Sequence, residues 1–379
     1  MLPEGWRETK VGKEYSVQLG KMLNKVAKEK YPQFKYLTNI NIRWGGFSVD
    51  NLNSMYFTES ERKKFNLSFG DLLVCEGGDV GRCAIWENNL EDCFYQKALH
   101  RVRSLHGNLT KYLGYILEYF SFIGKFKDIA TRTSIAHLTK EKLENTSILL
   151  PPLPEQEKIA AILSTWDKAI STTDALLANS RQQKKALMQQ LLTGKRRLPG
   201  FTGEWEEFQL LQRAIIIKGT QINKNTLASS GDYPVMNGGI LPSGYFNLYN
   251  SPANSIIISE GGNSCGFVQY MKTCFWCGGH CYKLEIKYDF DRYIYHYLKF
   301  FENRIMALRV GSGLPNIQKE RLASFAVKVP PLDEQRAIAA VLDAADKEIV
   351  LLEQKVARLR EEKKALMQQL LTGKRRVRL

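Results

Sequence analysis

The chain has 379 residues, of which 44% are hydrophobic and 25% are charged, and its formal net charge at pH 7 is +15. These proportions are those of an ordinary soluble globular protein, with room for two or three domains. No apolar run reaches the roughly 18 residues of a membrane span. The first residues lack the basic and apolar regions of a signal peptide. With seven scattered cysteines, the sequence predicts a cytoplasmic protein with reduced thiols and no membrane contact. The positive charge favours nucleic acid as the partner.

Residues 1–150 predict a first globular unit of short strands and tight turns. Strands are expected at 36–37, 39–42 and 72–74, and the last of these runs into Glu76, Gly77 and Gly78. A helix is predicted over 109–129, because one face of that segment carries aromatic and aliphatic side chains. A loop over 134–138 and a short helical turn over 140–143 complete this unit.

Residues 151–197 predict one long helix, and residues 330–379 contain a second copy of it. The two copies align without a gap at an offset of 179 residues, and 28 of 47 positions are identical. Their last fourteen residues are the same string, KKALMQQLLTGKRR. A period of this length indicates a duplicated half-protein, since solenoid repeats span only about 20–50 residues.

The apolar residues of the second copy follow the heptad spacing of a coiled coil from Ile349 onward, with Lys363 as the one polar member. The first copy keeps this register but places Thr173, Ser180 and Lys184 on the seam. A helix of nearly 40 residues would be roughly 57 Å long. Two such helices predict an intramolecular antiparallel coiled coil.

Leucine and methionine at the helix ends spread over more than one seam, so partner helices are expected to complete a bundle there. The residues predicted to dock a partner are Leu187, Met188, Leu191, Leu192, Leu366, Met367, Leu370 and Leu371.

Residues 198–329 repeat the plan of residues 1–150 at much lower identity. Residues 254–258 followed by Glu260, Gly261 and Gly262 match the earlier strand and its glycine turn. Residues 290–305 stand for the helix. The order is globular, helical, globular, helical. Because the helices kept their sequence while the globular units diverged, the units are expected to perform different versions of one task.

This organisation resembles the specificity (S) subunit of type I restriction-modification enzymes over essentially the whole chain. The motifs that carry the resemblance are LPPLPEQ at 150–156, PPLDEQ at 330–335, and the two LLTGKRR ends. The resemblance implies an α+β fold with two pseudo-symmetric mixed α/β target recognition domains, separated by the two long helices. It implies that each domain reads one half of a bipartite double-stranded DNA target. It also implies that two modification (M) subunits dock on the helices and methylate adenine, and that restriction (R) subunits join to cut DNA.

Residues that contact DNA can only be nominated by type, because Arg, Lys, Asn and Gln read base edges while Lys and Arg bind phosphates. In the first unit the nominated residues are Asn39, Asn41, Arg43, Arg82 and Arg132. In the second unit they are Lys218, Gln221, Lys224, Asn237, Asn263 and Arg309.

Catalytic motifs are missing from the sequence. The methyltransferase motif Asn/Asp-Pro-Pro-Tyr/Phe is absent, and so is the phosphate loop of ATP-binding proteins. The chain is therefore predicted to be no enzyme and to hold no cofactor. Two alternatives are a stand-alone DNA-binding regulator that dimerises through its helices and a nuclease acting alone. Cys274, Cys277, His280 and Cys281 could bind zinc, but four ligands in eight residues is too tight for the usual spacing, and core cysteines are the simpler interpretation.

Overall fold

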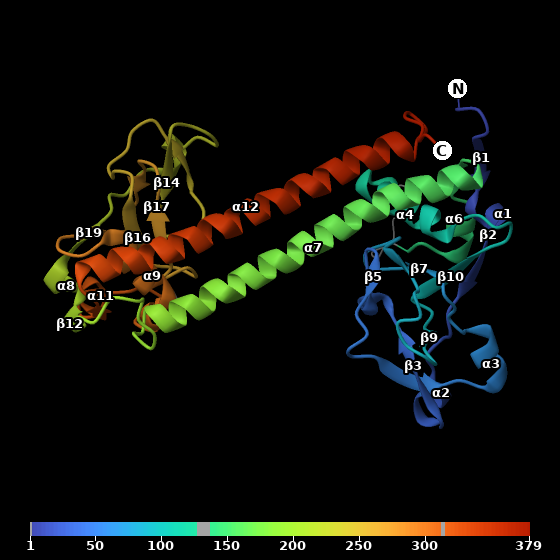
Figure 1. Cartoon of the computed structure of the whole chain (residues 1–379), viewed down its shortest axis with the longest axis horizontal. Helices are drawn as coiled ribbons and strands as arrows, with labels where there is room; N and C mark the ends of the chain where they lie inside the picture. Colours follow the sequence, from blue (N-terminus) through green and yellow to red (C-terminus); the bar gives the residue numbers. More distant parts are fainter. Residues whose placement is uncertain (1, 127–136, 312–314) are drawn as a thin grey trace. The chain divides into compact units, whose positions relative to one another are not determined.

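The computed structural model describes residues 2–126, 137–311 and 315–379, which form two compact units. Unit 1 consists of Met1–Asp174 and Gln354–Leu379, and unit 2 of Ala175–Glu353. Two helices of 39 residues each, α7 (Leu153–Leu191) and α12 (Leu332–Leu370), contribute one end to each unit (Figure 1). The compact units therefore cut across the predicted segments 151–197 and 330–379.

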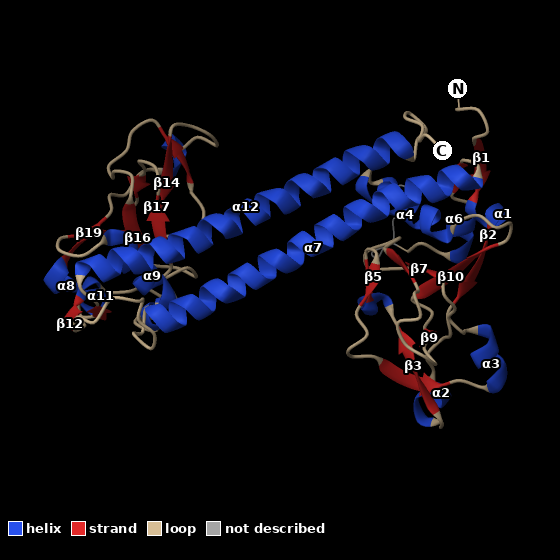
Figure 2. Ribbon diagram, in the orientation of Figure 1, coloured by secondary structure: helices blue, strands red, loops and turns tan. Residues whose placement is uncertain are grey.

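Unit 1 is built on a four-stranded antiparallel sheet. Its strand order is β2-β10-β7-β8, with the bounds β2 (Tyr15–Leu19), β10 (Leu99–Ser104), β7 (Leu72–Cys75) and β8 (Cys83–Ile85). All four residues of β7 are buried. Helix α4 (Thr110–Phe122) packs on this sheet and shares its core with the start of α7 and the end of α12 (Figure 2).

A second, three-stranded sheet in unit 1 has its own core, which is rich in aromatic side chains. Its order is β6-β3-β9, with the bounds β6 (Asn53–Tyr56), β3 (Gln33–Leu37) and β9 (Phe94–Tyr95). The remaining elements of unit 1 are β1 (Arg7–Lys10), α1 (Val11–Glu14), α2 (Lys25–Glu29), η1 (Asn39–Asn41), β4 (Ile42–Arg43), β5 (Gly46–Phe47), α3 (Glu59–Lys64), α6 (Lys140–Glu144) and β11 (Ser147–Leu150).

Unit 2 repeats this plan with matching strand orders. Its four-stranded sheet is β13-β19-β16-β17, with the bounds β13 (Ala214–Lys218), β19 (Cys281–Ile286), β16 (Ser255–Ser259) and β17 (Val268–Met271). Its three-stranded sheet is β15-β14-β18, with the bounds β15 (Gly244–Phe246), β14 (Tyr233–Met236) and β18 (Trp276–Cys277). The other elements are β12 (Glu206–Gln209), α8 (Leu210–Arg213), η2 (Lys224–Thr226), α9 (Asp291–Phe300), α10 (Glu302–Met306), α11 (Lys319–Ala323) and β20 (Ala326–Val329).

The two long helices run antiparallel within each unit, and matching ion pairs join them. In unit 2, Arg181 pairs with Glu353 at 2.6 Å. In unit 1, Arg360 pairs with Asp174 at 2.8 Å. Arg360 lies 179 positions after Arg181, and Asp174 lies 179 positions before Glu353, so the two pairs are equivalent. The seam positions Thr173, Ser180 and Lys363 are buried. Ser180 bonds to Glu348 at 3.2 Å, so the polar seam is hydrogen-bonded.

The predicted strand at 72–74 and the helical turn at 140–143 are confirmed by β7 and α6. Helix α4 ends at Phe122, inside the helix predicted over 109–129, where the chain turns at Gly124 with a φ of +75°. That conformation favours glycine and ends a helix. Residues 125–126 are again helical, and residues 127–129 lie outside the described residues. The helix predicted over 290–305 is broken into α9 and α10 at Phe301. The predicted loop at 134–138 falls largely outside the described residues.

Candidate nucleic-acid interface

Two nominated residues of unit 2, Lys218 and Asn237, line a cavity of about 530 Å³. The turn of Glu260, Gly261 and Gly262, which follows the buried strand β16, also lines this cavity. Gly262 has a φ of +76°, a conformation that only glycine adopts without strain, so the turn brings bare backbone to the cavity. The polar side chains of the wall are Lys218, Asn237, Glu260, Ser264, His280 and Asn316.

Glu260 is the acid at the centre of this cavity. Its Oε1 accepts hydrogen bonds from Lys218 Nζ at 2.7 Å and from the Tyr282 hydroxyl at 3.1 Å. Burial, with the nearby Glu260 charge, raises the pKa of Tyr282, so its hydroxyl stays protonated and donates. Oε2 faces His280 Nδ1 at 3.8 Å, beyond hydrogen-bond distance. Among the described residues, no hydrogen bond to Oε2 occurs, so this oxygen can accept a further donor.

The other nominated residues of unit 2 lie at different distances from this cavity. Gln221 lies against Gly279, next to His280 in the chain, and Asn263 is an exposed residue of the glycine turn. Arg309 is exposed and precedes Val310, which bonds to the cavity residue Asn316. Lys224 is exposed in η2, and no contact among the described residues brings it to the cavity.

Unit 1 has an equivalent turn of Glu76, Gly77 and Gly78 after β7. Asn39 Nδ2 lies 3.5 Å from the Gly77 carbonyl, and Arg82 donates to the Asn39 carbonyl at 2.8 Å. Two nominated residues therefore meet at the turn, as Lys218 and Asn237 do in unit 2.

The remaining nominated residues of unit 1 differ in their exposure and hydrogen bonds. Arg43 is exposed and donates to the Ile40 carbonyl at 2.7 Å. Asn41 is 6% exposed, and its amide accepts from the Thr38 backbone and donates to the Ser48 carbonyl. This side chain is buried and fixes the local fold, so it is not presented to a base. Arg132 lies outside the described residues.

The residues predicted to dock a partner are covered by this chain's own cores. Met188, Leu191 and Leu192 belong to the core of unit 2, and Met367, Leu370 and Leu371 to that of unit 1, all at most 8% exposed. Leu187 and Leu366 are partly buried against the same cores. The surplus apolar surface that suggested partner helices is satisfied by the adjoining sheet and helix. The six buried side chains are therefore closed to a partner while the units are folded, whereas Leu187 and Leu366 keep part of their surface exposed.

A different set of helix residues is both exposed and duplicated. All six exposed residues between 184 and 197 are identical to their counterparts 179 positions later. Seven of the nine exposed residues between 171 and 183 differ from theirs. Packing does not explain identity at exposed positions, so this strip is the better candidate for a shared partner. Its members are Lys185, Ala186, Gln189, Gln190, Lys195 and Arg196 in unit 2, and Lys364, Ala365, Gln368, Gln369, Lys374 and Arg375 in unit 1.

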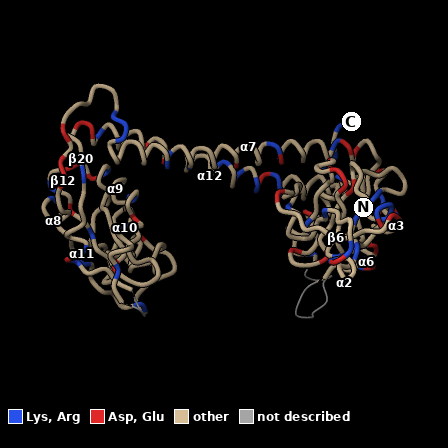
Figure 3. Tube along the Cα trace, turned by 90° about the horizontal axis from the view of Figure 1, so that it is seen from below, with Lys and Arg blue, Asp and Glu red and all other residues tan. Residues whose placement is uncertain are grey.

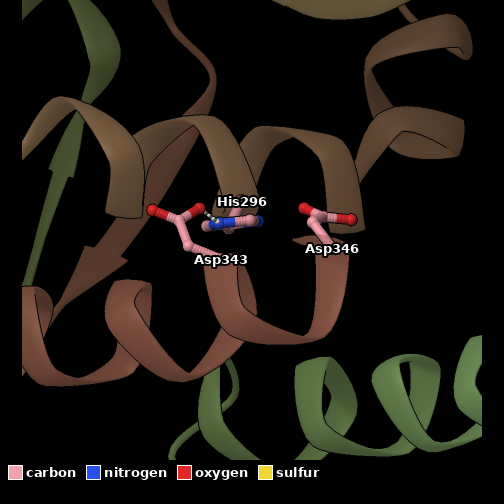
Figure 4. A group of neighbouring side chains, drawn as sticks. All are labelled: His296, Asp343 and Asp346. Carbon is pink, nitrogen blue, oxygen red and sulfur yellow. Dashed lines mark hydrogen bonds and ion pairs between the residues drawn. The ribbon is translucent and has the colours of Figure 1, made fainter. Parts of the chain in front are cut away.

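One cluster in unit 2 has the composition of a metal site, formed by His296, Asp343 and Asp346 (Figure 4). His296 Nε2 bonds to Asp343 at 2.7 Å. Asp343 also binds Arg292, and Asp346 binds Lys184. Two cations already balance the two carboxylates, so a divalent ion would have to displace them.

The cysteine cluster considered for zinc is not assembled as a site in the part of the chain that the structure describes. Cys277 and Cys281 are buried in a small core, and the Cys277 thiol lies against the Cys281 carbonyl at 3.7 Å. The His280 side chain lies at the cavity near Glu260 instead. These cysteines act as core residues.

Fold and site together define a duplicated α+β protein whose two units each present a glycine turn flanked by cations and amides. Lys and Arg occur on both units (Figure 3), and no helix among the described residues is long and apolar enough to cross a membrane. The model of the type I restriction modification DNA specificity domain matches residues 3–179 and 202–361, so the chain belongs to this family.

Several relatives and solved structures share this organisation. The specificity subunit of the type I restriction enzyme MjaVIII from Methanocaldococcus jannaschii is 25% identical over 99% of this chain and 94% of its own length. A candidate specificity subunit of the MjaX enzyme from the same organism is 28% identical over 83% and 80%. The crystal structure of a type I S subunit from M. genitalium matches with a TM-score of 0.71 at 17% identity, over 97% of this chain and 96% of that one. This last likeness establishes the shared fold.

Proposed function

We propose that this chain is the DNA-recognition and scaffold subunit of a type I restriction-modification complex, without catalysis of its own. The observation that carries the proposal is the duplication itself. Two units with matching strand orders present different side chains around the same glycine turn, while their helix ends expose an identical strip. Two different reading surfaces suit an asymmetric DNA target. Two identical strips suit the docking of two copies of one partner.

Each unit reads one half of a bipartite DNA target in the major groove. In unit 2 the reading surface is the cavity at Glu260, where Lys218 and Asn237 supply donors and the free carboxylate oxygen supplies an acceptor. In unit 1 it is the turn at Gly77 with Asn39 and Arg82. Exposed cations bind phosphates and position the unit, while amides and carboxylates discriminate base edges. Helices of 39 residues, roughly 58 Å long, suffice to separate readers by more than one turn of DNA, about 34–36 Å.

The exposed duplicated strip docks two methyltransferase (M) subunits, one per copy. Its side chains are small or polar, and they include an alanine flanked by lysine and two glutamines. The alanine permits close approach of a partner, and the polar side chains can form hydrogen bonds at the rim. Restriction (R) subunits join through the assembled complex.

Co-purification with the M subunit tests this assignment. We expect two M chains per copy of this chain by native mass spectrometry. Ala186→Glu should remove one M chain and Ala365→Glu the other, because each buries a charge in the interface. The matched controls, Asn179→Arg and Arg358→Asn, each give one copy the exposed residue that the other copy has at the equivalent position. Both variants should leave two M chains bound.

Two outcomes would contradict the proposal. A stable self-dimer that binds DNA and ignores the M subunit would favour a regulator. DNA cleavage by the purified chain with magnesium alone would favour a nuclease.

A further inference from the structure

Large apolar side chains are exposed beside the glycine turn in both units. Ile40 in unit 1 is 63% exposed, and in unit 2 Ile240 is 53% and Leu241 is 77% exposed. Each follows the central strand of the three-stranded sheet by a few residues: Ile40 comes after β3, and the pair Ile240 and Leu241 after β14. The two units have diverged in sequence, yet both expose an isoleucine at this place in the fold.

The backbone that presents these side chains in unit 2 is fixed by hydrogen bonds. The Gly238 carbonyl accepts from the hydroxyls of Ser259 and Ser264. Gln269 donates to the Ile240 carbonyl, and the Ser243 amide closes the loop onto Val235 at 2.8 Å. These hydrogen bonds fix the loop backbone in the conformation that exposes Ile240 and Leu241.

Unit 1 holds Ile40 by a different set of donors. Arg43 donates to the Ile40 carbonyl at 2.7 Å, and Arg82 donates to the neighbouring Asn39 carbonyl at 2.8 Å. The Asn41 amide also bonds to Thr38 at 3.0 Å, closing the 3-10 turn. Both loops present an apolar side chain to water, and its burial against a partner would be favourable.

The surroundings of the exposed groups identify the partner as DNA. Two guanidinium groups lie against the loop of Ile40, and the loop of Ile240 borders the cavity that holds Lys218 and Asn237. An apolar group flanked by cations and amides complements a surface that is anionic at its edges and carries a single kind of apolar group between them. In the major groove that group is the 5-methyl of thymine.

We propose that Ile40 in unit 1, and Ile240 with Leu241 in unit 2, contact thymine 5-methyl groups in the major groove, so that each unit recognises at least one A·T pair through an apolar contact. This inference rests on the proposed function, and it names a base that each unit reads.

Replacing thymine by deoxyuridine, which lacks only the methyl group, tests the proposal in the complex with the M subunits. Once methylated-base sequencing has given the target, each thymine of a duplex is replaced in turn and the equilibrium affinity is measured. At least one replacement per half-site should weaken binding roughly three- to fivefold, because the complex then loses the burial of one methyl group.

Variants assign each contact to its unit. Ile40→Ala should weaken binding by a similar factor and abolish the deoxyuridine effect in one half-site only. The double change Ile240→Ala with Leu241→Ala should do the same in the other half-site. Leu105→Ala and Leu211→Ala, at positions 52% and 60% exposed away from these loops, are the matched controls and should change neither affinity nor the deoxyuridine effect.

Several results would overturn this inference while leaving the proposed function standing. They are full affinity for every deoxyuridine duplex, or alanine variants that bind like the native chain. Weaker binding by the alanine variants with no deoxyuridine effect would show an apolar contact of another kind and would also overturn it. A complex that binds no DNA sequence selectively would overturn the proposed function, and this inference with it.

Discussion

The two units differ in the ion pairs that an equivalent lysine of each long helix forms. In unit 1, Lys363 is 6% exposed and pairs with Glu118 of α4 and Asp167 of α7, each at 2.6 Å. In unit 2 the equivalent Lys184 pairs with Asp346 alone among the described residues. Both units therefore keep the lysine–aspartate pair between α7 and α12, and among the described residues only unit 1 adds a glutamate from its globular part.

In unit 2, helix α9 contacts α12 through other groups. His296 and Arg292 of α9 both bind Asp343, a residue whose unit 1 counterpart is Ser164. Ser164 accepts a hydrogen bond from Lys111 at 3.0 Å. Each unit therefore couples its globular part to α7 and α12 through polar contacts. In unit 1 the buried Lys363 binds two carboxylates, whereas in unit 2 Asp343 and Asp346 are bound by different cations.

The largest difference between the units should follow removal of these lysines. Lys363→Met leaves Asp167 and the buried Glu118 without their cation, and should lower the free energy of unfolding of unit 1 by about 3 kcal/mol. Lys184→Met in unit 2 should cost about 1 kcal/mol, since its single pair is partly exposed to water. Hydrogen exchange of β10 and β19 reports the two units separately. Equal losses would contradict the difference drawn between them.

A second contrast lies at the start of each long helix. Glu155 is bound by Arg376 and by the Trp6 indole N–H at 3.1 Å, whereas Glu334 is bound by Arg197 at 2.6 Å. The indole N–H of Trp205 has no partner in the described chain. Arg197→Gln should therefore lower the midpoint of thermal unfolding of unit 2 more than Arg376→Gln lowers that of unit 1. The reverse order in calorimetry would show that Trp6 gives Glu155 no support.

The pH dependence of unit 2 follows from His296. Burial lowers the pKa of His296 below its usual 6.5, although Asp343 opposes the shift. The unfolded chain then takes up a proton first, so stability is present above pH 6.5 and is lost as pH falls from there toward the folded-state pKa. The charged groups facing the ring are Arg292, Asp343, Asp346 and Lys184.

Replacement of that histidine isolates its contribution. His296→Gln should flatten the loss of unit 2 stability between pH 6.5 and 5, measured by denaturant titration at each pH. The buried His100 of unit 1, whose pKa burial also lowers, serves as the internal control and keeps its own dependence. An unchanged slope in unit 2 would assign the effect to other groups.

The smallest expected effect concerns Tyr115 in unit 1. Its hydroxyl donates to Asp167 at 2.7 Å, so Tyr115→Phe should cost about 1 kcal/mol while Lys363 still binds the carboxylate. Tyr119→Phe is the matched control, since no hydrogen bond of its hydroxyl occurs in the described chain, and it should be close to neutral. Equal costs for the two variants would remove Tyr115 from the network.

The sequence predicted the features that local patterns encode. The duplication located α7 and α12, and the glycine pairs at 77–78 and 261–262 located the turns where the nominated residues meet. Periodicity also identified the apolar side chains of the helix ends, but it cannot tell which surface covers them. Leu191 and Leu370 are therefore buried in this chain's own cores.

Residues far apart in the chain were beyond sequence reasoning. Lys363 meets Glu118 across 245 positions, and no local pattern links the two. Asn41 had the side chain of a base reader, but its amide is used by the 3-10 turn. The exposed duplicated strip could have been found from the repeat if identity at polar helix positions had been weighed above identity at apolar ones.

The proposed function holds that the lengths of α7 and α12 set the spacer between the two half-sites. Inserting seven residues after Asp174 and seven after Glu353, where the two units meet in the chain, lengthens both helices by one heptad, about 10 Å. Sequencing of methylated bases in cells that carry the M subunit then gives the target. The account predicts unchanged half-sites with a spacer longer by about 3 base pairs. A continuous target, or the original spacer with the lengthened helices, would contradict it.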